Sequence, residues 1–265
     1  MNELLISEDF YSIQGEGISS GYPSYFIRLA NCNLCCGTSF KHLNEIRKGN
    51  YEPGNFKGDL HQQNLATWTC DTIPVWIKGE KRPFSYLIDR WKEQGLFEHI
   101  RDEIIRLIWT GGEPLLQQQG IVDFNHFFAE QTSTYPYNEI ETNGTVYINT
   151  ELFPLIDQIN CSPKLKNSGN DTRLRYKTDA LERITQHSNY QFKFVISEEK
   201  DMEEIFNDYI NPLNIPLTNV VIMPGLDDQR DFHERTRFVL ETAKKYKVIG
   251  LTRLHVSAWN KTTGV

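Results

Sequence analysis

Short apolar segments alternate along this chain with segments whose apolar residues recur at helical spacing. The segments with the character of strands are 4–6, 25–29, 104–109, 139–141, 158–160, 192–196, 220–223 and 251–256. Helical periodicity is found in 122–131, 181–187, 202–209 and 231–247. Strands that alternate with helices are typical of βαβ units, so the pattern predicts an α/β fold with a mainly parallel sheet. With about eight strands, we expect an open or partial barrel rather than a flat sheet.

Two polar stretches interrupt this pattern. The first, 38–67, contains several dipeptides with glycine or proline, and we expect little regular structure in its second half. The second irregular stretch is 72–83. Because the 265 residues contain no internal repeat and no low-complexity tract, we expect one domain over 1–265 with an insertion at about 38–67.

The acidic balance of the chain limits its partners. A formal net charge of -7 argues against general binding of nucleic acid, because such proteins are usually basic. The first ten residues lack the basic and then apolar pattern of a signal peptide, and no apolar run has the length of a membrane span. We therefore expect a cytoplasmic protein that binds neither nucleic acid nor membranes.

Polar residues and glycines follow three of the predicted strands. The segments are 110–114 (Thr-Gly-Gly-Glu-Pro), 141–145 (Glu-Thr-Asn-Gly-Thr) and 161–164 (Cys-Ser-Pro-Lys). Taken singly, the first is a simple strand-to-helix turn and the second an Asn-Gly hairpin turn. In a parallel α/β sheet, however, ligands bind at the carboxyl ends of strands, and glycines there let the backbone approach a ligand closely. Three such ends in succession predict one ligand site.

Four of the five cysteines lie close together in the sequence. They are Cys32, Cys35, Cys36 and Cys70, whereas Cys161 stands apart. In a reducing compartment such a group favours metal binding or catalysis over disulfides. The alternative is that each cysteine is a small buried apolar residue.

The identity of the metal remains open at this point. His42 and His61 are near the cysteines in sequence, so a zinc site is one possibility. A set of three cysteines has a different use in iron–sulfur chemistry, because it binds three irons of a [4Fe–4S] cluster and leaves the fourth iron open for a substrate atom.

Taken together, these segments resemble the radical S-adenosylmethionine superfamily and, within it, the 7-carboxy-7-deazaguanine synthase family. The matching segments are 10–17, 26–34, 70–72, 110–117, 141–145 and 162–164, with weaker matches at 192–195, 223–224 and His255. They occur in the expected order over nearly the whole chain. The resemblance implies a partial (open) TIM-like barrel of the radical SAM type with inserted loops.

The resemblance implies that cysteines bind the cluster, but the sequence departs from the usual Cys-x-x-x-Cys-x-x-Cys motif. Cys32 and Cys36 have the first spacing, while the third ligand is displaced to Cys70 by the insertion. The choice between Cys35 and Cys36 stays open, and the spacing favours Cys36.

The resemblance also assigns the other site residues. The positions implied for S-adenosylmethionine are Thr69, Asp71, Gly111, Gly112, Glu113, Ser162, Pro163 and Lys164. The positions implied for the pterin substrate are Ile13, Gln14, Gly15, Glu16, Arg28, Thr110, His255 and the final residue Val265. Thr72 matches the threonine that helps to hold Mg²⁺. Arginine suits a substrate carboxylate, because its guanidinium pairs bidentately with carboxylates.

The reaction implied by the resemblance is a radical ring contraction. The family converts 6-carboxy-5,6,7,8-tetrahydropterin to 7-carboxy-7-deazaguanine with loss of ammonia, using a [4Fe–4S] cluster, S-adenosylmethionine and Mg²⁺. An external electron donor such as flavodoxin and a homodimer are further expectations. Two alternatives are an activating enzyme for a glycyl-radical protein, in the same superfamily, and a non-catalytic zinc-binding module.

Overall fold

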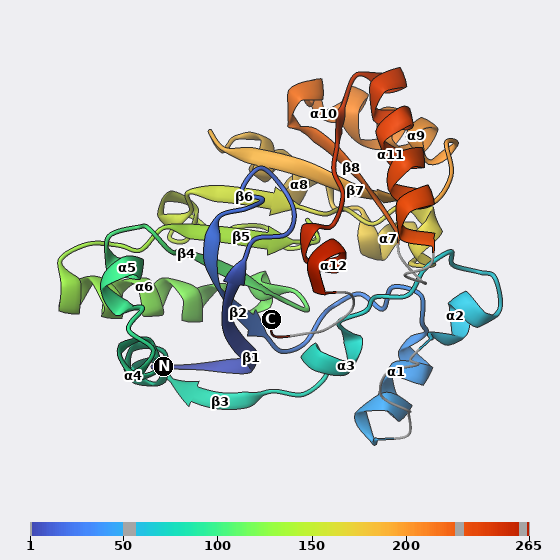
Figure 1. The fold of residues 1–265 in the computed structure, drawn as a ribbon. Coiled ribbons are helices and arrows are strands. Elements are labelled where there is room, and N and C mark those ends of the chain that lie inside the picture. The colour runs from blue at the N-terminus through green and yellow to red at the C-terminus, as the bar shows by residue number, and fades with distance from the viewer. Residues whose placement is uncertain (1, 50–56, 226–230, 260–263, 265) are drawn as a thin grey trace.

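One mixed sheet organises the molecule (Figure 1). The computed structural model describes residues 2–49, 57–225, 231–259 and 264. Within them the strands are β1 (Glu3–Ile13), β2 (Pro23–Leu29), β3 (Glu80–Pro83), β4 (Arg106–Gly111), β5 (Asn138–Thr142), β6 (Gln158–Cys161), β7 (Tyr190–Ile196), β8 (Val220–Pro224) and β9 (Ile249–Gly250). Their order in the nine-stranded sheet is β3-β1-β2-β4-β5-β6-β7-β8-β9. β1 pairs antiparallel with β2 and β3, and every pair from β2 to β9 is parallel, which confirms the open, mainly parallel sheet.

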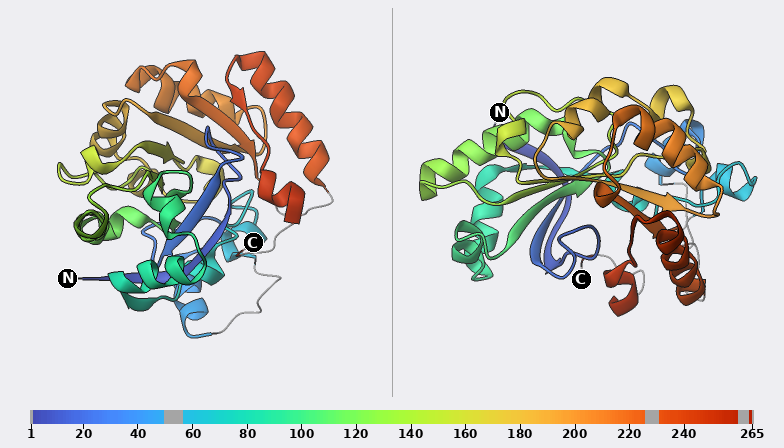
Figure 2. Two further views of the ribbon diagram at one scale, coloured as in Figure 1. Left: turned by 60° about the vertical axis from the view of Figure 1, so that its left-hand side comes forward. Right: turned by 90° about the horizontal axis from the view of Figure 1, so that it is seen from above.

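Helices lie on both sides of this sheet. They are α1 (Phe40–Arg47), α2 (Asp59–Gln62), α3 (Ile73–Trp76), α4 (Phe84–Glu93), α5 (Phe97–Arg101), α6 (Gln118–Thr132), α7 (Thr172–Arg175), α8 (Thr178–Thr185), α9 (Asp201–Glu204), α10 (Asn211–Leu213), α11 (Phe232–Tyr246) and α12 (Leu254–Trp259). A π-helix, η4 (Ile205–Ile210), continues α9, and a short 3₁₀ turn, η1 (Pro114–Gln117), precedes α6. Seen from above, α6 lies on one side of the sheet and α12 on the other (Figure 2).

Side chains alternate between the two faces of the central strands. In β5, Ile140 belongs to the main apolar core, whereas Glu139 and Glu141 point to the opposite face and meet Gln14. The core face is packed by aromatic rings, such as Trp109 against Phe124 with ring centroids 5.4 Å apart. The other face is therefore polar although it is largely buried, and this is the face that α12 covers.

The four predicted helices are confirmed, as are seven of the predicted strands. The eighth, 251–256, is wrong: the chain makes only the short β9 and then turns into α12. Leu254 N donates to Gly15 O (3.0 Å), and Val256 packs on Phe232. These contacts come from distant parts of the chain, so they override the local alternation of apolar residues.

The two polar stretches contain more regular structure than expected. α1 and α2 form within the insertion, and Asp59 ties them together by accepting from Ser39 N (2.7 Å) and Ser39 Oγ (2.6 Å). α3 and β3 form within 72–83, so the prediction of an irregular stretch there is wrong. β3 is a charged edge strand (Glu-Lys-Arg-Pro), and charged residues are common on sheet edges.

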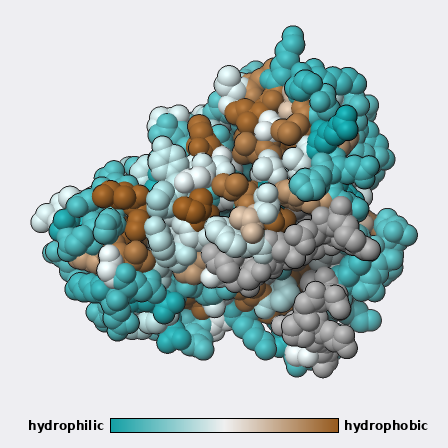
Figure 3. Space-filling model, viewed as in Figure 1, coloured by the Kyte–Doolittle hydropathy of each residue, from teal (hydrophilic) through white to brown (hydrophobic). Residues whose placement is uncertain are grey.

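The exterior is mostly hydrophilic in the view of Figure 3, where apolar residues reach the surface in separate patches. Cys161 lies in the main core and is fully buried, as the apolar interpretation of that cysteine predicts. No helix within the described ranges is long and apolar enough to cross a membrane.

Candidate active site

The cysteines after β2 divide between two apolar clusters. Cys36 packs with Leu34 and Trp68 in one cluster, and Cys35 packs with the buried side of α1 and α3 in the other. Cys32 and Cys70 contact both clusters. Cys35 and Cys36 therefore belong to different apolar clusters, and Cys35 packs against α1 and α3.

Burial disfavours ionisation of the thiols of Cys32, Cys35 and Cys36. It raises the pKa of Cys36 to about 12 and that of Cys35 to about 11, and it also raises the pKa of Cys32. The pKa of Cys32 is raised further by the nearby Cys36, Glu113 and Cys70. Metal coordination removes the proton from such a thiol, so a metal centre is what would hold these sulfurs as thiolates.

Each sulfur of this trio (Cys32, Cys36 and Cys70) has a polar partner nearby. The partners are Leu34 N (3.5 Å) and Asn143 Nδ2 (3.9 Å) for Cys32, Asn170 Nδ2 (3.2 Å) for Cys36, and Thr72 Oγ1 (3.2 Å) for Cys70. Donors to cysteine sulfur are typical around iron–sulfur clusters, where they tune the cluster.

The chemistry of the donor set fits an iron–sulfur cluster, whose usual ligands are cysteine thiolates. Among the described residues, no group of three His, Cys, Asp or Glu side chains is arranged to hold one metal ion. A [4Fe–4S] cluster does not require this convergence, because each cysteine binds a different iron. His42 and His61 instead contact Thr38 (2.9 Å) and Thr69 (2.9 Å) and help to hold the insertion in place.

The glycines after β4 pack against the start of the cysteine loop. A side chain at Gly111, whose φ is +119°, would lie 2.2 Å from Leu29 O, and one at Gly112 would lie 2.0 Å from Asn31 O. Gly112 N donates to Leu29 O (3.1 Å). The glycines are thus required for close approach between two segments of the chain, and their expected contact with a ligand stays a prediction.

Glu113 is part of the same junction. It is fully buried and accepts from Thr142 Oγ1 (2.8 Å), Asn143 N (2.7 Å) and Leu115 N (3.1 Å). Burial raises its pKa to about 7 against the effect of these donors. Its carboxylate joins the ends of β4 and β5.

The third strand end continues this edge. Ser162 N donates to Thr142 O (2.7 Å), and Lys164 Nζ donates to Ser162 Oγ (3.0 Å). Lys164 Nζ also lies 5.9 Å from the centre of the Trp68 ring. Pro163, which lies between Ser162 and Lys164 in the sequence, is buried. The ends of β4, β5 and β6 are therefore brought to one edge, beside the cysteine trio.

A second group of polar side chains lines the buried face of the sheet. Gln14 is buried, and its Nε2 donates to Glu139 (2.8 Å) and Glu141 (3.2 Å). Thr110 Oγ1 donates to the other oxygen of Glu141 (2.7 Å). Ile13 ends β1 opposite Pro23, one residue before this group.

Charged residues join this polar face to the cysteine loop. Glu16 pairs with Lys193 (2.7 Å) and with Arg253 (2.8 Å), and Arg253 also reaches Asp71 (3.3 Å), next to Cys70 in sequence. Burial alone would lower the pKa of Lys193, but Glu16 and Glu141 raise it above its ordinary value. Burial would likewise raise the pKa of Glu16, yet Lys193 and Arg253 hold it well below its usual range.

Sequence reasoning missed Lys193, Arg253 and Glu139 as parts of the site. A signal for Lys193 was present, because a lysine between two phenylalanines of an apolar strand must face away from the core. Arg253 offers no such signal, because the strand predicted over 251–256 does not form.

The remaining predicted residues lie around this polar face. Arg28 pairs with Glu8 (3.1 Å), and its guanidinium lies 5.4 Å from the centre of the Phe10 ring. A side chain at Gly15 would collide with His255 Nδ1 (2.1 Å), so α12 is in close contact with this loop. Val265 lies outside the described residues.

The fold and the site define a class of protein: an iron–sulfur enzyme of the radical S-adenosylmethionine type. The chain is similar to the 7-carboxy-7-deazaguanine synthase of Clostridium acetobutylicum, with 30% identity over 230 residues, covering 83% of this chain and 80% of the relative. It is 26% identical to that of Pyrobaculum aerophilum over 261 residues, covering 98% and 96%. The chain belongs to the 7-carboxy-7-deazaguanine synthase family.

A solved structure agrees in fold. The crystal structure of QueE from Escherichia coli matches 96% of this chain and 95% of its own with a TM-score of 0.60 and 20% identity. This likeness confirms the expected partial barrel of the radical SAM type. No family model matches the chain.

Proposed function

We propose that this protein is a 7-carboxy-7-deazaguanine synthase, which converts 6-carboxy-5,6,7,8-tetrahydropterin to 7-carboxy-7-deazaguanine with loss of ammonia. The observation that carries the proposal is that the cysteine trio and the buried polar face are connected in a chain that belongs to this family. The cysteine trio lies at the strand-end edge, and Arg253 connects it through Asp71 and Glu16 to the buried polar face. Neither a zinc-binding module nor a glycyl-radical activating enzyme requires such a face.

The cysteine trio (Cys32, Cys36 and Cys70) would bind the [4Fe–4S] cluster. When bound, the cluster supplies the electron for reductive cleavage of S-adenosylmethionine, and the bound Mg²⁺ supplies a Lewis acid. The protein's part is to hold three thiolates in an apolar pocket and to leave the fourth iron open.

S-adenosylmethionine would bind along the strand-end edge. The backbone of Gly111 and Gly112 faces this edge, and Ser162 and Lys164 offer a hydroxyl and a cation to the carboxylate or the ribose. The side chain of Thr69 is already engaged by His61 (2.9 Å), which leaves its backbone for this role. Asp71 and Pro163 would flank the cofactor.

The pterin would bind on the polar face. Gln14 and Glu141 present amide and carboxylate groups that match the mixed donors and acceptors of a pterin edge. Arg28 would exchange its present partner Glu8 for the substrate carboxylate, and α12 with His255 would close the site. Thr72 offers an oxygen to Mg²⁺, which prefers oxygen ligands and keeps several waters.

Other properties belong to the same proposal. A single nine-stranded sheet runs through the described residues, which supports one domain with an insertion at about 38–67. We further propose a homodimer in the cytoplasm that receives electrons from an external protein such as flavodoxin.

The decisive experiment is anaerobic reconstitution with iron and sulfide, followed by incubation with S-adenosylmethionine, Mg²⁺, reductant and the carboxy-pterin. We expect brown protein and formation of 7-carboxy-7-deazaguanine by mass spectrometry. Cleavage of S-adenosylmethionine without the deazaguanine product would retain the class of enzyme and reject the substrate. A colourless protein that binds stoichiometric zinc would reject both.

A further inference from the structure

The segment after β6 (residues 162–171, the β6–α7 segment) lies against both ends of the insertion. Ser168 O accepts from Gly37 N (2.8 Å), and Asn167 O accepts from Thr67 N (2.9 Å). The segment thus bridges the residues that follow Cys36 and those that precede Cys70. Its position controls how these two parts of the cysteine loop are held together.

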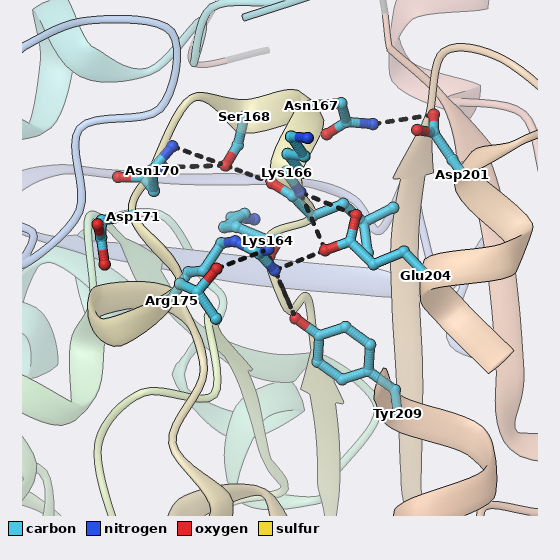
Figure 4. A network of polar contacts seen from close by, with 12 residues as sticks. Lys164, Lys166, Asn167, Ser168, Asn170, Asp171, Arg175, Asp201, Glu204 and Tyr209 are labelled. Atoms are coloured by element: carbon cyan, nitrogen blue, oxygen red, sulfur yellow. Dashed lines mark hydrogen bonds and ion pairs between the residues drawn. The ribbon is translucent and has the colours of Figure 1, made fainter. Parts of the chain in front are cut away.

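The far side of the β6–α7 segment is anchored in the core (Figure 4). Arg175 is almost fully buried, pairs with Glu204 (2.7 Å) and donates to Lys164 O (3.0 Å). Tyr209, on the π-helix η4, also donates to Lys164 O (3.2 Å). Buried polar contacts of this kind hold a loop in one geometry, so the β6–α7 segment is a fixed support rather than a loose loop.

Within this support, the orientation of the Asn170 amide is determined by a backbone group. Asn170 is 8% exposed, and its Oδ1 accepts from Cys35 N (3.1 Å). A buried backbone N–H requires an acceptor, so the oxygen must face Cys35. The amide nitrogen then faces the other way, where it donates to Cys36 Sγ (3.2 Å) and Ser168 Oγ (3.1 Å).

The two ends of this amide suit two different sulfurs. Cys35 Sγ lies 3.8 Å from the Asn170 oxygen, to which it donates. Cys36 Sγ instead accepts from the amide nitrogen. The side chain of one asparagine therefore distinguishes the neighbouring cysteines that spacing left open.

We propose that Asn170 is a positioning residue that donates an N–H···S hydrogen bond to the Cys36 thiolate and thereby raises the reduction potential of the cluster. This inference rests on the proposed function, because it assumes a [4Fe–4S] cluster on Cys36. Reduction adds one electron from an external one-electron donor, with no bond formed or broken. Part of the added charge resides on the cysteine sulfurs, so an N–H donor stabilises the reduced cluster more than the oxidised one.

The test compares midpoint potentials of the reconstituted full-length protein, measured by redox titration with electron paramagnetic resonance. Asn170→Leu removes the amide, and Asn170→Asp retains the acceptor for Cys35 N but places a carboxylate oxygen against the sulfur. Asn167→Ala is the matched control, because Asn167 lies in the same support and contacts Trp68 and Asp201 but no sulfur.

We expect both Asn170 variants to bind the wild-type amount of iron with a more negative midpoint potential, and Asn170→Asp to shift further. Asn167→Ala should lower the free energy of unfolding and leave the potential unchanged. Equal potentials in all proteins, or equal shifts in Asn167→Ala and Asn170→Leu, would overturn the proposal. Because no S-adenosylmethionine or pterin is added, these results do not depend on the substrate. Failure of the proposed function would instead appear as a wild-type protein without a cluster or, in the separate activity assay, as a wild-type protein with a cluster that forms no deazaguanine.

A measurement on the wild-type protein covers the case in which the variants lose their iron. The N–H···S hydrogen bond contains an exchangeable hydrogen, so transfer to D₂O should shift the Fe–S(Cys) stretching bands in the resonance Raman spectrum. Asn170→Ser, whose shorter side chain cannot reach the sulfur in the same way, should show a smaller shift. An identical isotope shift in both proteins, or none in the wild type, would contradict the role of Asn170.

Discussion

The two halves of the candidate site, the cysteine trio and the polar face, differ in how their buried polar groups are compensated. Around the cysteine trio, apolar residues such as Leu34 and Trp68 surround the sulfurs, and the polar partners are neutral amides and a hydroxyl. On the polar face, full charges are buried and compensate one another, as Glu16 does with Lys193 and Arg253. One half offers sulfurs with neutral polar partners, whereas the other is charged and already paired.

This difference follows from what each half must bind. A thiolate gains stability from metal coordination, so an apolar pocket with a few N–H donors is sufficient. A polar heterocycle with a carboxylate needs preformed donors and acceptors, and burying these is tolerable only when each charge has a partner. Loss of one cysteine should therefore remove the cofactor, while loss of one charge should weaken folding and binding.

The largest contrast is expected between neighbouring cysteines. Cys36→Ala and Cys32→Ala should abolish cluster binding and turnover, because each removes a ligand of one iron. Cys35→Ala should retain the cluster, since its sulfur packs against α1 and α3. Iron and sulfide analysis of the reconstituted proteins measures this. The opposite result, with iron lost in Cys35→Ala and retained in Cys36→Ala, would exchange the two assignments.

The second largest effect is expected on the free energy of unfolding, when the charge network loses Lys193, its most buried member. Lys193→Met leaves Glu16 and Glu141 without their shared cation, and loss of one partner of a buried pair costs about 3–5 kcal/mol. Urea denaturation of the cluster-free protein measures the free energy of unfolding. The double variant Lys193→Met/Glu16→Gln should recover part of the loss. No recovery would indicate that the damage comes from packing rather than from an unpaired charge.

The contact between the halves should matter mainly for substrate binding. Arg253→Leu removes the ion pairs to Glu16 and Asp71, and this partly exposed pairing is worth about 1–2 kcal/mol. That corresponds to a roughly 5–30-fold increase in KM for the carboxy-pterin. Steady-state kinetics should show a smaller change in kcat. Lys244→Ala, on the exposed side of α11, is the control and should leave KM unchanged.

The smallest expected effect is a pH dependence of substrate binding through His255 on α12. Burial lowers the pKa of His255, and Arg253 lowers it further, while Glu16, Asp71 and Glu141 oppose this. A depressed folded-state pKa means that the contribution of neutral His255 is complete above its unfolded pKa of about 6.5 and is lost as the pH falls. KM for the pterin should rise modestly below that pH, and His255→Gln should abolish this rise. A pH profile identical in both proteins would refute the role of His255.

Much of this architecture was predictable from local patterns. Period-two alternation and apolar runs identified the strands from β4 to β8, because each strand has one face in the core and the signal is contained within a few residues. The polar strand ends predicted a single site, since parallel strands place their carboxyl ends at one edge. The edge strand β3 was missed because its charged residues carry no such pattern.

The sequence by itself determined the α/β class, the strand ends that meet at one edge and the group of cysteines near them. The tertiary structure decided that Cys35 and Cys36 pack in different apolar clusters, why Gly111 and Gly112 are glycines, and that 251–256 leaves the sheet to form α12. The physical reason is the separation along the chain over which each kind of interaction acts. Alternation and turn chemistry act over a few residues, whereas the contacts of Asn170 with Cys36 and of Arg253 with Glu16 join residues 134 and 237 positions apart.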